Sequence, residues 1–330
     1  MNRYEYAVPE TVAEVFGYLD GSGAMIKAGG VDLLDLMKED LLAPKRLVNI
    51  RHIKELKYIK KDKDGNLHIG PNTTLAELAA DDTIGKMCPA LVQAADEAAT
   101  PQIRNIATLG GNLCQRPRCW YFRSIDFNCS RKGGDVCFAL DGENQYHAIF
   151  MNESGCAIVH PSATAVALLA LDAELRIKSA GDERSVRLSD FFVSPDKDIR
   201  KENILKPGEL IIDVMIPAKL TAFRSYYIKQ KEKQSFDWPI ADVAVALDLA
   251  GTNVREARLV LGSAAPVPFR VIEAERMLAG KPISKKLARE TAESALAGAN
   301  PLGRNEYKIQ VFKAIIYRTI CRAAGLDPMT

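Results

Sequence analysis

The sequence predicts an α+β fold, because strands and helices form separate runs instead of alternating along the whole chain. In the last third, "AFRSYYIKQ" and "IADVAVALDLAGTNVREARLVLGSAAPVPFR" are typical of three or four antiparallel strands, and three helical segments follow them. Hairpin signals at Asp64-Gly65 and Ala180-Gly181 add two antiparallel pairs earlier in the chain. The GxGxxG pattern of a parallel, doubly wound nucleotide fold does not occur in the glycine turns.

The other elements follow from hydrophobic spacing and turn residues. "ETVAEVFGYL" has helical spacing, and "AMIKAGGVDLLDLM" predicts a short strand, a glycine turn and the start of a helix. "RLVNIRHI" and "PGELIIDVMIP" are typical of strands, and "TLAELAADDTIGKMCPALVQAADEAA" has helical periodicity. "QIRNIATLGGNLC" is strand-like and contains a glycine pair, and "CAIVHPSATAVALLALDA" predicts a helix.

Composition describes an ordinary globular protein. The chain has 330 residues, of which 47% are hydrophobic and 26% charged, with a net charge of +2. Such a weak net charge does not indicate nucleic acid or a membrane surface as a partner. No apolar run reaches the length of a transmembrane helix, and "MNRYEYAVPETVAEVFGYL" lacks the apolar stretch of a secretory signal. A cytoplasmic location is expected, or the periplasm if the folded chain is exported with a partner that carries a signal.

The first glycine turn is a candidate phosphate site. "IKAGGVDLL" places Lys27, Gly29 and Gly30 between an apolar strand and a helix beginning near Asp32. A glycine pair lets the backbone approach a ligand, and successive N–H groups at a helix start favour an anion. The alternative is a tight turn without a ligand.

The second glycine turn, "TLGGN" from Thr108 to Asn112, has the same character about eighty residues later. Two such turns suit the two phosphates of one dinucleotide. Lys229, near the end of a predicted strand, is by itself more typical of a solvated surface charge.

Five of the seven cysteines lie between Asn112 and Cys156, in a stretch without a helical or strand period. The spacing does not match a CxxC zinc knuckle or the cysteine run of bacterial ferredoxins. The residues alone leave three alternatives open: an iron–sulfur cluster, a zinc site, and disulfides or free thiols. Neighbouring basic side chains could offset the negative charge of a cluster, and neighbouring aromatic side chains could exclude water from it. The basic residues are Arg116, Arg118, Arg123, Arg131 and Lys132, and the aromatic ones are Trp120, Tyr121, Phe122 and Phe127.

Three motifs in this order, "IKAGGVDLL", "QIRNIATLGGN" and "YYIKQ", resemble the FAD-binding subunit of the xanthine oxidase family of molybdenum hydroxylases. The resemblance implies a two-subdomain, PCMH-like FAD-binding domain over residues 1–220. It also implies a small α+β domain of the CO dehydrogenase flavoprotein type over residues 221–330. The cysteine-rich stretch, at about 113–157, is similar to an insertion in the flavin subunits of periplasmic aldehyde oxidoreductase and 4-hydroxybenzoyl-CoA reductase. "QRPRCWYFR" and "GCAIVHPS" resemble the aldehyde oxidoreductase form more closely.

This resemblance assigns roles to particular residues. It implies that FAD binds at Lys27, Ala28, Gly29, Gly30, Val31, Asp32, Leu33, Thr108, Gly110, Gly111, Asn112 and Lys229. It implies that a [4Fe–4S] cluster is held by Cys119, Cys129, Cys137 and Cys156. Cys114 is not among these ligands, and Ala163 stands where the family often has Asp. No residue of the chain is expected to be catalytic.

The implied function is electron transfer within an oxidoreductase complex. The expected partners are a large molybdenum cofactor subunit, a small [2Fe–2S] subunit and an external electron acceptor. Aldehyde oxidation is the expected reaction of the complex. The alternatives are a 4-hydroxybenzoyl-CoA reductase-like or xanthine dehydrogenase-like enzyme and, from another class, a zinc-stapled binding protein without flavin.

Overall fold

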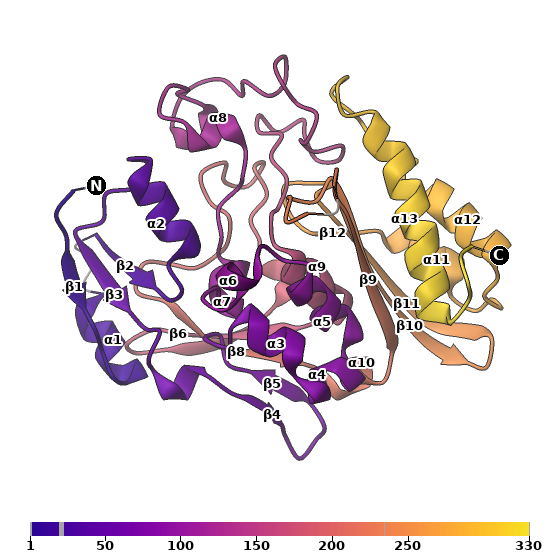
Figure 1. The fold of residues 1–330 in the computed structure, drawn as a ribbon, viewed down its shortest axis with the longest axis horizontal. Coiled ribbons are helices and arrows are strands. Elements are labelled where there is room, and N and C mark those ends of the chain that lie inside the picture. The colour runs from indigo at the N-terminus through magenta and orange to yellow at the C-terminus, as the bar shows by residue number, and fades with distance from the viewer. Residues whose placement is uncertain (1, 20–22, 234, 330) are drawn as a thin grey trace.

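The computed structural model describes residues 2–19, 23–233 and 235–329, and its strands form three sheets (Figure 1). The first sheet is parallel, with strand order β1-β3-β2. Its strands and helices are β1 (Glu5–Ala7), α1 (Val12–Tyr18), β2 (Ala24–Lys27), α2 (Val31–Lys38) and β3 (Arg46–Asn49). Strand β2 of this small βαβαβ unit ends directly at the first glycine turn. The turn therefore lies at the carboxyl edge of a parallel sheet.

The second sheet is antiparallel and has the order β4-β5-β8-β6-β7. Its strands are β4 (Ile59–Lys61), β5 (Leu67–Ile69), β6 (Glu174–Lys178), β7 (Glu183–Arg187) and β8 (Leu210–Ile216). The two predicted hairpins are present as β4–β5 and β6–β7, and Gly65 has a φ of 88° in the first of them. The associated helices are η1 (Lys54–Leu56), α3 (Leu75–Ala80), α4 (Asp82–Met87), α5 (Pro89–Asp96), α9 (Ala163–Ala170) and η3 (Leu188–Asp190).

The third sheet, with order β12-β11-β10-β9, is antiparallel and belongs to the C-terminal part. Its elements are α10 (Ala218–Thr221), β9 (Arg224–Gln230), β10 (Ala241–Ala250), β11 (Asn253–Gly262), β12 (Phe269–Arg270), α11 (Ile272–Leu278), α12 (Lys285–Ser294) and α13 (Tyr307–Ala324). Alternate residues of β10 face two different cores: Ala244 and Ala246 pack with α9, whereas Val243 and Val245 pack with the last helices. Burial on both faces explains the nearly continuous apolar run of this strand.

The helix α9 is buried at every position, which fits its sequence of small and apolar residues, "ATAVALLA". It packs between α5 and the third sheet, and thereby joins the two parts of the chain around one core. No helix within the described residues is both long and apolar enough to cross a bilayer.

The prediction of a strand in "QIRNIATLGGNLC" is wrong. The structure has two short helices there, α6 (Pro101–Arg104) and α7 (Leu109–Leu113). Thr100 and Thr108 cap them, since each hydroxyl accepts a hydrogen bond from the backbone N–H three residues later. The threonine caps override the strand-like composition of the segment.

The cysteine-rich segment is mostly irregular, with only α8 (Trp120–Arg123) and the 3₁₀ turn η2 (Ser130–Lys132). In Figure 1 it rises as a lobe above α6 and α7. It therefore stands next to the second glycine turn, from which it leaves the main body of the fold.

Candidate functional site

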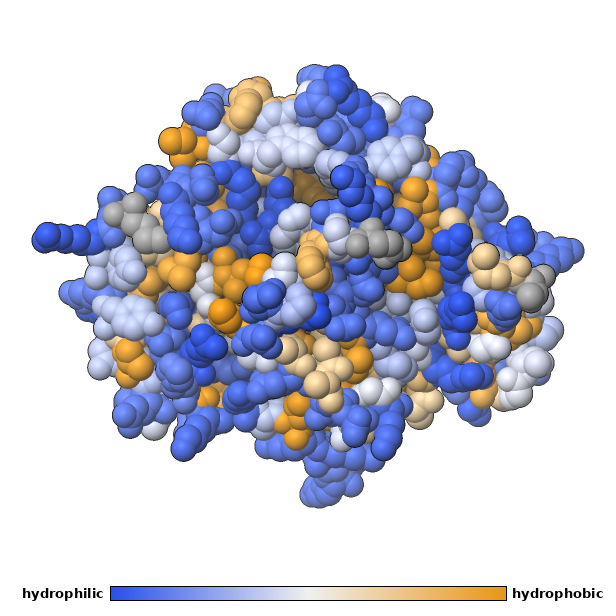
Figure 2. Space-filling view, viewed as in Figure 1, coloured by the Kyte–Doolittle hydropathy of each residue, from blue (hydrophilic) through white to orange (hydrophobic). Residues whose placement is uncertain are grey.

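A cavity of about 1060 Å³ lies between the parallel unit, the cysteine-rich segment and the β9–β10 connection. Figure 2 shows this face of the molecule hollowed beneath the upper lobe. All predicted residues from Lys27 to Leu33 line the cavity, as do Thr108, Gly111, Asn112 and Lys229. The structure thus brings together site residues that are as far apart as 200 positions in sequence.

The first glycine turn is shaped by two different requirements. Gly30 has a φ of 78°, the left-handed conformation that glycine adopts without a side-chain clash, and it begins α2. Gly29 lies directly against the other loop, where an added Cβ would collide with the carbonyl oxygen of Ile106. The two glycine loops therefore touch, and their backbones line one side of the cavity together.

The second glycine turn forms the first turn of α7. The Thr108 hydroxyl accepts from the N–H of Gly111 at 3.2 Å. Gly110 does not line the cavity; it packs behind it, where a Cβ would lie 2.9 Å from the Cβ of Pro71. Of this glycine pair, Gly111 faces the ligand space and Gly110 allows the helix to seat on the neighbouring loop.

The side chain of Asn112 is oriented by two hydroxyl groups that the sequence did not single out. Ser162 and Thr164 each donate to its Oδ1 at 2.6 Å. The amide nitrogen is therefore the part of this side chain left for a ligand in the cavity. Ala163, between the two hydroxyl residues, also lines the cavity.

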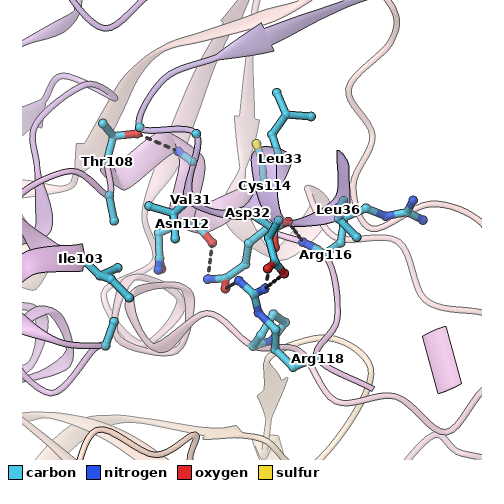
Figure 3. A pocket seen from close by; sticks show the side chains of 18 of the residues that line it. Val31, Asp32, Leu33, Leu36, Ile103, Thr108, Asn112, Cys114, Arg116 and Arg118 are labelled. Atoms are coloured by element: carbon cyan, nitrogen blue, oxygen red, sulfur yellow. Dashed lines mark hydrogen bonds and ion pairs between the residues drawn. The ribbon is translucent and has the colours of Figure 1, made fainter. Parts of the chain in front are cut away.

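Asp32 connects the first glycine turn to the cysteine-rich segment. Its carboxylate accepts from the backbone N–H of Arg116 at 2.8 Å and pairs with Arg118 at 2.8 Å (Figure 3). It also pairs with Arg123 at 2.6 Å. Arg123 also pairs with Asp35 one turn later in α2, at 3.0 Å. The carboxylate of Asp32 is thus engaged with the neighbouring segment.

Two lysines contribute positive charge to the cavity wall. Lys229 donates from Nζ to the carbonyl oxygen of Glu97 at 2.8 Å, and burial lowers the pKa of its ammonium group to about 8. Burial, and next the charge of Arg51, lower the pKa of Lys27. An anionic ligand in the cavity would favour the charged form of both groups.

Arg118 is a cavity residue that sequence reasoning placed only near the cysteines. Its guanidinium group lies 4.7 Å from the centre of the Trp238 ring, and its Nε is buried without a protein partner. A buried donor without a partner is costly, so this atom favours a ligand that accepts a hydrogen bond.

The four predicted metal ligands converge although 37 positions separate the first from the last. Cys119 and Cys129 belong to one apolar cluster with Leu36, and Cys119 and Cys137 belong to the next one with Tyr121. Cys137 and Cys156 are hydrogen-bonded to each other, and all four thiols are free. Within the described part of the chain, no three His, Cys, Asp or Glu side chains are close enough to enclose a single metal ion.

Backbone N–H groups point at three of these sulfur atoms. Those of Tyr121 and Phe122 donate to Cys119, and that of Ile158 donates to Cys156. Cys137 accepts three, from Ala139, Leu140 and Ala157. The bond from Cys156 lowers the pKa of Cys137 below the ordinary thiol value, whereas donating that bond raises the pKa of Cys156. These donors favour the thiolate form, which is the form that binds metal, whereas burial raises the pKa of Cys119 to about 11.

The four arginines of this segment pair with carboxylates, whereas Lys132 donates to the backbone carbonyl oxygens of Tyr121 and Ser124. Arg131 is buried and pairs with Glu202 at 2.8 Å, and Arg116 pairs with the same carboxylate at 3.0 Å. Arg131 still favours a negative charge on Cys156. These pairs fasten the segment to the loop at residues 199–202.

The remaining cysteines lie elsewhere. Cys88 and Cys321 are buried in apolar cores. Cys114 ends α7 and lines the cavity, and burial raises the pKa of its thiol to about 12.

Comparison with known proteins finds two family models in the chain. Residues 2–219 match the FAD binding domain in molybdopterin dehydrogenase, and residues 226–323 match the CO dehydrogenase flavoprotein C-terminal domain. The chain belongs to the family of FAD-binding subunits of molybdopterin dehydrogenases. The predicted α+β architecture and the assignment to an FAD-binding oxidoreductase component are thereby confirmed.

Individual relatives of this FAD-binding subunit cover nearly its whole length. It is 32% identical to the aldehyde oxidoreductase FAD-binding subunit PaoB of Escherichia coli (strain K12), over 91% of this chain and 92% of that protein. It is 26% identical to the carbon monoxide dehydrogenase medium chain of Hydrogenophaga pseudoflava, over 96% of both chains. Among solved structures, that of quinoline 2-oxidoreductase from Pseudomonas putida 86 matches with a TM-score of 0.76 at 26% identity, over 98% of both chains.

Three observations indicate that the cavity of this FAD-binding subunit suits FAD. The glycine loops allow close approach of backbone, the cavity wall carries two lysines, and the Nε of Arg118 lacks an acceptor. All three features favour a ligand with an anionic, oxygen-rich centre such as a pyrophosphate.

Proposed function

We propose that this chain is the electron-transfer subunit of a molybdenum-dependent aldehyde oxidoreductase, with FAD in the cavity and a [4Fe–4S] cluster on Cys119, Cys129, Cys137 and Cys156. The observation that carries the proposal is the convergence of these four thiols beside the cavity. The 32% identity to an aldehyde oxidoreductase subunit over most of the chain supports the choice of reaction.

The two glycine loops would hold the FAD pyrophosphate. Backbone N–H groups at the start of α2 supply donors, Gly29 lets the two loops touch, and Gly111 lines the cavity without a side chain. The amide of Asn112 and the Nε of Arg118 are further donors on the cavity wall. When bound, FAD supplies two-electron chemistry that can be divided into single-electron steps.

The four cysteines would hold the cluster, which supplies one-electron transfer when bound. The N–H groups directed at the sulfurs would stabilise their negative charge. Tyr121 and Phe122 are buried in the same segment and would keep water from the site. This chain's task is then to hold both groups at a fixed separation, since Asp32 fastens the cysteine-rich segment to the flavin loop.

The proposed partners are a large molybdenum cofactor subunit, a small [2Fe–2S] subunit and an external electron acceptor. Electrons would enter from the first two and leave from FAD. A second candidate, a xanthine dehydrogenase-like complex, is favoured by a relative with 26% identity over 96% of this chain, the xanthine dehydrogenase FAD-binding subunit of Escherichia coli O157:H7.

Cofactor analysis of the purified chain tests the proposal directly. We expect one FAD, released by acid, and four irons per chain, with structured flavin absorbance on a broad iron–sulfur background. Zinc in place of iron would reject the cluster, and protein without flavin would reject the cavity assignment. Proteins that copurify, and the activity of that complex with aldehydes and with xanthine, separate the two candidate reactions.

Single cysteine variants test the ligand set. Replacing any of Cys119, Cys129, Cys137 and Cys156 by Ser should reduce the iron content far below four per chain. Cys114→Ser is the matched control, because Cys114 lies in the same stretch but away from the four. Loss of iron in the control with retention in Cys156→Ser would reject this assignment.

A further inference from the structure

His147 lies against one of the four converging thiols, in the irregular part of the cysteine-rich segment. Its Nε2 is 3.3 Å from the Sγ of Cys119, and the residue is buried. The ring is held edge-to-face against Trp120, with 5.5 Å between ring centres. Its other nitrogen, Nδ1, is buried without a partner. All of the polar interaction of this imidazole is therefore directed at the sulfur.

The backbone of His147 is fixed from the other end of the molecule. Its carbonyl oxygen accepts from the Nζ of Lys308 at 2.9 Å and from the Nδ2 of Asn305 at 3.1 Å. Lys308 lies in the first turn of α13 and Asn305 just before this helix, about 160 positions later in the chain. The C-terminal part of the chain thus positions the imidazole.

Lys308 holds the chain around His147 through three carbonyl groups. It is completely buried, and its Nζ donates to the carbonyl oxygens of Tyr146, His147 and Ser263. These contacts fix the backbone that carries the imidazole facing Cys119.

We propose that His147, held in place by Lys308 and Asn305, donates an N–H···S hydrogen bond to the Cys119 thiolate and thereby raises the reduction potential of the cluster. This inference rests on the proposed function, because it requires Cys119 to be a cluster ligand. A metal-bound thiolate carries no hydrogen, so the hydrogen between the two atoms must be on Nε2. Hydrogen bonds to the sulfurs favour the reduced, more negative cluster. His147 is expected to change the reduction potential of the cluster, not to decide whether the cluster binds.

A redox titration of the full chain in its complex, followed by electron paramagnetic resonance, tests the proposal. His147→Phe keeps an aromatic ring beside Trp120 but removes the donor, and should move the midpoint potential to a more negative value. His147→Gln keeps an N–H at a similar reach and should restore the wild-type potential. An unchanged potential in His147→Phe, or the same shift in both variants, would overturn the inference.

A second measurement does not depend on whether His147→Phe assembles its cluster. In wild-type protein with ¹⁵N-labelled histidine, the reduced cluster should show a weak nuclear coupling to ¹⁵N in pulsed paramagnetic resonance. That coupling should vanish in labelled His147→Gln. Its absence from the wild type, or its persistence in the variant, would show that His147 does not contact the cluster ligand.

Iron content keeps the two proposals apart. Wild-type protein without four irons contradicts the proposed function itself. Wild-type protein with four irons and a His147→Phe variant of unchanged potential contradicts only the role of His147.

Discussion

At the scale of single residues, Gly29 is required by contact between two loops rather than by backbone conformation. Its φ lies outside the left-handed region, yet a Cβ would meet the carbonyl oxygen of Ile106. Gly30, its neighbour, is required for the opposite reason, because its φ is 78°. Adjacent glycines in one turn therefore have separate physical functions.

We expect Gly29→Ala to push the two glycine loops apart and to weaken FAD binding by about tenfold or more, equivalent to about 1.4 kcal/mol. Flavin fluorescence titration of the flavin-free chain measures the dissociation constant. Gly181→Ala is the control, since nothing lies within 4 Å of its added Cβ. Equal flavin affinity in both variants would mean that the contact between the loops is irrelevant to the cofactor.

His160 is a single residue with a consequence for pH. It is buried, it accepts at Nδ1 from the N–H of Ser162, and its Nε2 has no partner. Burial, and next the charge of Arg131, lower its pKa to about 3. The folded chain thus keeps this imidazole neutral, whereas the unfolded chain binds a proton below its ordinary pKa of about 6.5.

The stabilisation linked to His160 is therefore present above about pH 6.5 and is lost as the pH falls towards 3, by up to about 1.4 kcal/mol per pH unit. His160→Asn keeps an acceptor for Ser162 but cannot be protonated. Between pH 7 and 5 we expect the wild type to lose about 2 kcal/mol more unfolding free energy than this variant. Urea denaturation at both pH values measures it, with exposed His52→Asn as control. Parallel losses in wild type and His160→Asn would contradict the prediction.

At the scale of elements, α2 joins the first glycine turn to the cysteine-rich segment. Its first turn carries Asp32, which holds Arg118 and Arg123, and its second carries Asp35, which also holds Arg123. The first glycine turn and the cysteine-rich segment are therefore both attached to one helix, α2. An ordered cysteine-rich segment should favour the flavin-binding form of the first glycine turn. By linkage, bound FAD should favour the ordered form of the cysteine-rich segment.

We expect Asp32→Asn to weaken that coupling. In the wild type, FAD should bind more tightly to the iron-loaded chain than to the iron-free chain, and the difference should shrink towards zero in the variant. Flavin titration of both forms provides the four dissociation constants of this cycle. Asp135→Asn, an exposed position of the same segment, should keep the wild-type difference. Equal coupling in the Asp32 variant and the wild type would show that the link runs elsewhere.

At the scale of the whole molecule, the cysteine-rich segment is held between the N-terminal and C-terminal parts. Arg131 fastens it to the loop at residues 199–202, and Lys308 and Asn305 fasten it to the start of α13. The segment contains little regular structure of its own, so these distant contacts replace a local core.

Removing the buried amino group of Lys308 should destabilise the whole chain. Lys308→Met takes the donor away from the carbonyl oxygens of Tyr146 and Ser263 and leaves that of His147 with Asn305 alone. We expect it to lower the unfolding free energy by about 3 kcal/mol. Urea denaturation measures the change, and Lys286→Met, at a largely exposed side chain, is the control. A loss no larger than that of the control would mean that the three contacts are not important for stability.

Local preference was enough to predict most elements, the first glycine turn and the two hairpins. Glycine conformation, turn residues and hydrophobic period act within a few residues, so they can be read along the chain. The same reasoning failed at residues 101–113, where threonine capping outweighed a strand-like composition. It also said nothing of the parallel βαβαβ unit inside an otherwise antiparallel protein.

The partners of the site residues were decided only by the tertiary structure. Asp32 faces arginines from the cysteine-rich segment, Asn112 is oriented by Ser162 and Thr164, and His147 reaches Cys119 under the control of α13. Each of these contacts joins segments from 28 to about 160 positions apart. Such pairs depend on how sheets and helices pack around a shared core, and neither spacing nor composition encodes that packing.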